Sequence, residues 1–123
     1  MTLLVGKIIR GEGWGRKLGF PTANLSPKIL PPKKLTDGVY AARIRVGRRT
    51  YEGIVIVGAP TFFGRREKKL EAYLFDFKGN LYGKIIEAEV VTKIRTMKMF
   101  TNTGLLLKQI ARDVRDAKKV LRK

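Results

Sequence analysis

Apolar and polar residues alternate in short runs along most of the chain, which predicts strands. The run "LLVGKII" (3–9) is short and partly β-branched, and Gly11 follows it after Arg10, as is typical of a buried strand. In "VYAARIRV" (39–46) apolar residues alternate with Arg43 and Arg45, which indicates a half-exposed strand. "YEGIVIVG" (51–58) is apolar on both faces. A turn at 47–49 separates these two runs, so they predict a hairpin.

The same alternation continues in "LEAYLFDF" (70–77) and "GKIIEAEVVTKI" (83–94), which are expected to form a second hairpin around the turn "KGN". After Asn102, an expected N-cap, the period changes from two to between three and four. The apolar residues of this helical stripe are Leu107, Ile110, Val114, Ala117 and Leu121. Lys, Arg and Asp residues are expected to face water. The pattern predicts a small antiparallel β-barrel with a terminal helix packed on it.

The segment 10–34 contains all but one of the prolines and is predicted to be a long structured loop, which is where functional sites often lie. In "GRKLGFPTAN" an extended backbone would point Thr22 and Asn24 the same way, so two neutral oxygens could face one Mg²⁺ ion held with nucleotide phosphates. The alternative is that both residues cap a turn. The preceding glycines with Arg16 and Lys17 suit a phosphate chain, although an ordinary glycine-rich surface loop would look the same.

Glu71 is the candidate general base. In a strand over 70–77 it would share a face with Tyr73, Phe75 and Phe77, and a carboxylate beside aromatic rings tends to gain proton affinity. A base tuned in this way can accept a proton near neutral pH. The alternative is that Glu71 lies at a frayed strand start and pairs with a neighbouring lysine.

Composition limits the chemistry and the partners. The 123 residues include no cysteine and no histidine, which excludes disulfides, a thiolate nucleophile and the commonest metal ligand. The length suits a single domain over residues 1–123, and no run is long and apolar enough for a membrane span, so a soluble, cytoplasmic monomer is expected. The net charge of +17 favours contact with polyanions, yet the cations are spread along the chain as in an ordinary solvated surface.

The order of several motifs resembles the riboflavin kinase family over nearly the whole chain. These are "GKIIRGEGWGRKLGFPTANL", "DGVYAA", "APTF", "LEAYLFDFKGNLYGK", "IRTMKMF" and "LLLKQIARDVRDAKKVL". The resemblance implies a six-stranded Greek-key barrel with a C-terminal helix. It also implies transfer of the γ-phosphoryl group of ATP to the 5′-hydroxyl of riboflavin, which gives FMN. Phosphoryl transfer needs positioning, a metal, cations and one base, none of which requires His or Cys.

The resemblance implies a role for each matching residue. Thr22 and Asn24 would bind Mg²⁺, and Glu71 would be the catalytic base. Nucleotide-binding residues would be Gly11, Arg16, Thr22, Asn24, Leu74 and Tyr82, and flavin-binding residues would be Arg95, Lys98 and Phe100. The chain departs from the family pattern at Val57, where asparagine is frequent, and at Met97, where an acidic residue is common.

Alternative interpretations concern both the phosphoryl donor and the functional class. Riboflavin kinases that use CTP share the barrel but have a different metal motif, so "PTAN" favours ATP. A barrel of this family without catalysis could instead use its basic surface to bind nucleic acid, but the sequence lacks the exposed aromatic face of single-strand binders. The chain could also stabilise a separate adenylyltransferase. The expected partners are therefore riboflavin and ATP, with no specific nucleic acid and no membrane.

Overall fold

The computed structural model describes residues 2–9, 23–27, 35–59, 69–98, 100 and 102–122. It contains the elements β1 (Thr2–Ile9), β2 (Ala23–Pro27), β3 (Gly38–Val46), β4 (Arg49–Ala59), β5 (Lys69–Leu74), β6 (Ile85–Arg95) and α2 (Thr103–Leu121). The predicted strands at 3–9, 39–46 and 51–58 and the predicted terminal helix are therefore confirmed.

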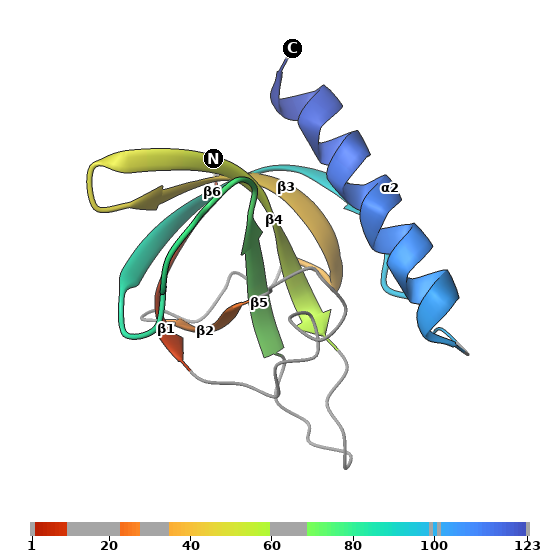
Figure 1. Cartoon of the computed structure of the whole chain (residues 1–123), viewed down its shortest axis with the longest axis horizontal. Coiled ribbons are helices and arrows are strands. Elements are labelled where there is room, and N and C mark those ends of the chain that lie inside the picture. Colours follow the sequence, from red (N-terminus) through yellow and green to blue (C-terminus); the bar gives the residue numbers. More distant parts are fainter. Residues whose placement is uncertain are drawn as a thin grey trace.

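The six strands form a closed barrel in the order β1-β2-β5-β4-β3-β6, and every neighbouring pair is antiparallel. Within it, β3, β4 and β5 follow one another as neighbours, and β6 returns to lie beside β3. This is the strand order of a Greek key. Figure 1 shows α2 running along the outside of this barrel. The predicted fold class, a six-stranded Greek-key barrel with a C-terminal helix, is confirmed.

Two local predictions were wrong. The segment 10–34 was expected to be a loop throughout, but 23–27 is the strand β2, which pairs with both β1 and β5. β5 and β6 do not form a hairpin, because β5 lies between β2 and β4 while β6 lies between β3 and β1. The alternation of a strand shows which side chains share a face, but it contains no information about which strand lies alongside.

The barrel interior holds the main hydrophobic core, to which every strand contributes. Its most deeply buried members include Ile44, Val55, Ile86, Ala72 and Ala88, each with 0% exposure. Val57, one of the departures from the family pattern, belongs to this core. Strand β4 is buried on both sides, as predicted, because Val55 and Val57 face the interior while Ile54 packs outside the barrel.

The helix covers the outer face of β3, β4 and β6. Its apolar stripe, in which Ala117 and Leu121 are buried, packs on Val39, Ala41 and Ile54. The Asn102 side chain accepts a hydrogen bond of 2.9 Å from the backbone N–H of Leu105, so the predicted N-cap is confirmed. Among the described residues, no helix is long and apolar enough to cross a membrane.

Candidate active site

Asn24 and Glu71 lie directly opposite one another on the neighbouring strands β2 and β5. Directly opposed residues of an antiparallel pair point to the same face, with Cβ atoms about 4.5–5.5 Å apart. Leu25, Leu70 and Ala72, their chain neighbours, are buried in the barrel interior, so Asn24 and Glu71 face outward. The register therefore brings the predicted metal ligand and the predicted base together on the outer surface of the barrel.

Glu71 is not at a frayed strand end. It is the third residue of β5, it is half-buried, and it has register partners on both sides, Asn24 in β2 and Ile56 in β4. Its face also includes Tyr73, whose ring meets Phe75 edge-on at 5.5 Å. The predicted neighbourhood of aromatic rings is thus partly present.

The predicted strand over 70–77 ends early, and this changes the face of Phe77. β5 stops at Leu74, and Asp76 follows in a left-handed conformation with φ 60°. Beyond this turn, Phe77 packs against the barrel core and meets Tyr51 edge-on at 5.2 Å. Phe77 therefore does not share the face of Glu71, and the expectation that it does was wrong.

Tyr82 and Leu74, both predicted on the nucleotide side, occupy different environments. Tyr82 is 53% exposed on the connection between β5 and β6. That connection is tied to β1, because the backbone N–H of Gly83 donates to the carbonyl of Ile8 at 2.9 Å. Ile9 in turn pairs with Asn24, so Tyr82 lies at the barrel end to which Asn24 belongs. Leu74 is buried in the core with 4% exposure, and its contact with a nucleotide stays a prediction.

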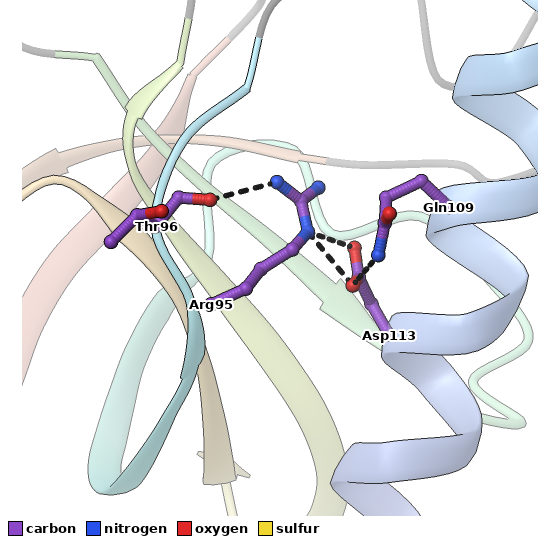
Figure 2. Close-up of polar contacts among 4 residues, drawn as sticks. All are labelled: Arg95, Thr96, Gln109 and Asp113. Carbon is purple, nitrogen blue, oxygen red and sulfur yellow. Dashed lines mark hydrogen bonds and ion pairs between the residues drawn. The ribbon is translucent and has the colours of Figure 1, made fainter.

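Arg95, predicted on the flavin side, is held between the end of β6 and the helix. Its Nε donates to both carboxylate oxygens of Asp113, at 2.8 and 3.0 Å, and its Nη1 donates to the carbonyl of Thr96 at 3.1 Å (Figure 2). The Gln109 side chain donates to the same carboxylate at 2.9 Å. This network fixes the chain just after β6 against α2.

The two other predicted flavin residues follow Arg95 along the chain. The guanidinium carbon of Arg95 lies 5.9 Å from the centroid of the Phe100 ring, within the range of a cation–π contact. Lys98 is exposed. Residues 95–98 and Phe100 therefore include a largely buried, paired arginine next to a half-buried ring, and an exposed lysine.

One row of register partners runs around the barrel through the predicted site. It passes from Asn24 to Glu71, then through Ile56 and Val39 to Arg95. Neighbouring strands are about 4.8 Å apart, so the three steps from Glu71 to Arg95 cover about 14 Å of sheet. Because the closed barrel has six strands, three steps are half of the ring, so the predicted base and the predicted flavin-side arginine lie on opposite strands.

Three predicted nucleotide-binding residues, Gly11, Arg16 and Thr22, lie outside the described residues. Asn24 follows Thr22 by two positions in the chain. Within the described part, no three acidic, histidine or cysteine side chains gather as metal ligands. Asn24, the described one of the two predicted metal ligands, offers a hard amide oxygen, which suits a magnesium ion whose other ligands come from phosphates and water.

Asp113 is the functional candidate that the sequence interpretation missed. Aspartates of the helix were expected to face water, but Asp113 is 1% exposed because it pairs with Arg95. A signal was available in the sequence. Asp113 is three residues after Ile110 and four before Ala117, which places a carboxylate on the apolar stripe of the helix. A buried charge at such a position requires a partner.

A family model described as "Flavokinase: Riboflavin kinase" matches residues 2–121. The chain belongs to the flavokinase family. Among its curated relatives is the "RNA-binding riboflavin kinase RibR" of Bacillus subtilis, 40% identical over 115 residues. That match covers 93% of this chain and 49% of the relative, so the chain spans about half the length of that protein.

Two solved structures resemble this flavokinase barrel. One, titled "Crystal Structure of Macrolide-efflux Protein from Streptococcus pneumoniae", has a TM-score of 0.83 and 28% identity, and the match covers 94% of this chain and 38% of that one. The other is riboflavin kinase from Trypanosoma brucei, with a TM-score of 0.65 and 22% identity, covering 98% and 80%. At that identity, the second likeness shows the fold alone.

Proposed function

We propose that this chain is a riboflavin kinase that transfers the γ-phosphoryl group of ATP to the 5′-hydroxyl of riboflavin, giving FMN and ADP. The observation that carries the proposal is the opposed pair Asn24 and Glu71 on the outer face of a flavokinase barrel. The pair brings together on one face an amide that can bind a metal ion and a carboxylate that can accept a proton. Phosphoryl transfer needs both a metal ion and a base close to the reacting phosphate.

Glu71 is assigned as the general base. Its carboxylate accepts the proton of the ribityl 5′-hydroxyl while that oxygen forms a bond to the γ-phosphorus, and the bond from the γ-phosphorus to the departing ADP oxygen breaks. The backbone of Glu71 is fixed by ladder partners on both sides, so only its side-chain torsions remain to be ordered when the substrate binds. Positioning of this kind provides much of the rate enhancement of phosphoryl transfer.

Asn24, together with Thr22, is assigned as the protein part of a Mg²⁺ site. When bound, the ion neutralises charge on the phosphates. The nucleotide is expected to contact Gly11, Arg16, Leu74 and Tyr82, and the flavin to contact Arg95, Lys98 and Phe100. Tyr82 and Asn24 both lie beside the end of β1, which supports a nucleotide site at that end of the barrel.

The deciding experiment incubates the purified protein with riboflavin, divalent metal and each common nucleoside triphosphate in turn, then separates the flavins by chromatography. FMN formed with ATP and Mg²⁺ is the expected product. No FMN with any triphosphate and metal would refute the kinase proposal. FMN formed only with CTP would support the kinase activity and refute ATP as the donor.

We further propose that residues 1–123 form a single kinase domain, so FMN and ATP should give no FAD.

Nucleic-acid binding is the second candidate function, because the chain carries a net charge of +17 and the similar protein RibR is named as RNA-binding. Several of the described cations are engaged in ion pairs within the fold. Arg95 pairs with Asp113, Arg45 with Glu87, and Arg122 with Glu52. We therefore propose that contact with nucleic acid is weak and independent of sequence.

A further inference from the structure

Asp113 is the one buried charged side chain among the described residues. Two independent partners hold it, the Arg95 guanidinium from the barrel and the Gln109 amide from one turn earlier in α2. Burying two charges costs free energy, and their attraction often does no more than offset that cost. A buried ion pair is therefore weak support for a role in stability alone, and the question is what else Asp113 does.

The carboxylate fixes the orientation of Arg95. A guanidinium is a rigid planar fork, so occupying Nε with Asp113 and Nη1 with the Thr96 carbonyl determines where the third nitrogen points. No hydrogen bond joins Nη2 to another described residue, and Figure 2 marks none from it to Thr96, Gln109 or Asp113. The Arg95 side chain is 13% exposed. Its orientation is therefore set by Asp113 and the Thr96 carbonyl.

The same contacts also hold the segment that follows β6. The bond to the Thr96 carbonyl bends the guanidinium back over its own chain, and the Phe100 ring lies 5.9 Å from the guanidinium carbon. Asp113 belongs to α2. The helix is therefore linked to the chain after β6 by the ion pair between Asp113 and Arg95.

We propose that Asp113 is a positioning residue for the flavin substrate, acting through Arg95 to hold residues 95–98 and Phe100 in their binding conformation. The inference rests on the proposed riboflavin kinase function. Arg95 is three strands away from Glu71 along the register row, so a change at Asp113 should alter flavin binding and leave the nucleotide side unaffected.

The test is Asp113→Asn, which keeps the shape of the side chain and removes its charge. The KM for riboflavin should rise about tenfold, the equivalent of one hydrogen bond to a charged group. The KM for ATP should stay unchanged. The dissociation constant of FMN, followed by quenching of flavin fluorescence, should rise by a similar factor without any turnover being needed. Asp113→Glu keeps the charge and should recover part of the affinity.

The matched control is Leu121→Ala. Leu121 is 5% exposed and packs at the other end of α2, so its truncation weakens the docking of the helix while the Arg95 pair stays intact. A second variant, Gln109→Ala, removes one hydrogen bond from Asp113 and should raise the KM for riboflavin by a smaller factor. It keeps the proposal testable if Asp113→Asn does not fold.

The outcomes separate this inference from the proposed function. If the unaltered protein neither phosphorylates nor binds riboflavin, both are wrong. If it does both, either of two results would show that Asp113 is only structural. The Asp113 and Gln109 variants would change the constants for riboflavin and for ATP equally, or they would change them no more than Leu121→Ala does. A selective rise in the flavin constants, absent from Leu121→Ala, would support the positioning role.

Discussion

Replacing Glu71 by glutamine tests the proposed base with the smallest change of shape. The side chain is half-buried on β5, opposite Asn24 and Ile56, and glutamine fits the same space. The backbone ladder on both sides does not depend on the carboxylate. Folding should therefore be nearly unaffected, with a change in the free energy of unfolding below about 1 kcal/mol.

The expected loss of activity follows from the role of the carboxylate. A positioned general base contributes roughly 10²–10⁴ to the rate, which is about 3–5 kcal/mol of transition-state stabilisation. Glutamine has no proton-accepting carboxylate, so kcat should fall by that factor. The KM values for riboflavin and ATP should change little, because an amide retains the size and polarity of the group that contacts them.

The assay is steady-state FMN formation by the Glu71→Gln variant, with unfolding followed in parallel. Glu89→Gln is a matched control, since Glu89 is also a half-buried glutamate on a strand, but it lies on β6 opposite Leu3 and Arg43. This control should turn over at the normal rate. If Glu71→Gln also kept near-normal turnover, the base assignment would be wrong and catalysis would rest on positioning and the metal.

Three further predictions concern the metal, the charge and the helix. Asn24→Ala should lower turnover and raise the Mg²⁺ concentration needed for half-maximal activity, with excess Mg²⁺ restoring part of the rate; an unchanged Mg²⁺ titration would contradict the ligand role. Binding to RNA or DNA, measured by filter retention, should weaken steeply between about 50 and 200 mM salt, and tight binding at the higher salt would favour the nucleic-acid function. Asn102→Ala removes the 2.9 Å cap of α2 and should cost about 1 kcal/mol in denaturant unfolding, whereas no loss would mean that packing alone fixes the helix start.

Local patterns were sufficient to predict most elements. The alternating run 39–46 and the continuous apolar run 51–58, separated by a short turn, gave the correct hairpin, because a tight turn joins strands that pair antiparallel. The three- and four-residue spacing from Leu107 to Leu121 predicted α2, and Asn102 marked its start. The ordered motifs were enough to recognise the family, which the family model over residues 2–121 then showed.

Strand β2 and the end of β5 could not be predicted in the same way. β2 has only five residues, ending in Pro27, and its stability comes from ladder contacts with β1 and β5 rather than from its own sequence pattern. β5 ends because Asp76 adopts a left-handed conformation, which an alternating sequence does not reveal. The position of Phe77 followed from that turn.

The sequence alone determined which residues are suited to the chemistry, since Asn24, Glu71 and Arg95 stand in recognisable motifs. Their arrangement was decided only by the tertiary structure, because Asn24 and Glu71 are far apart in the chain and become opposed through the register of β2 and β5. Asp113 shows the same dependence. Its carboxylate could leave water only because the barrel brings the end of β6 against α2 and supplies a cation there, and no local pattern specifies that contact.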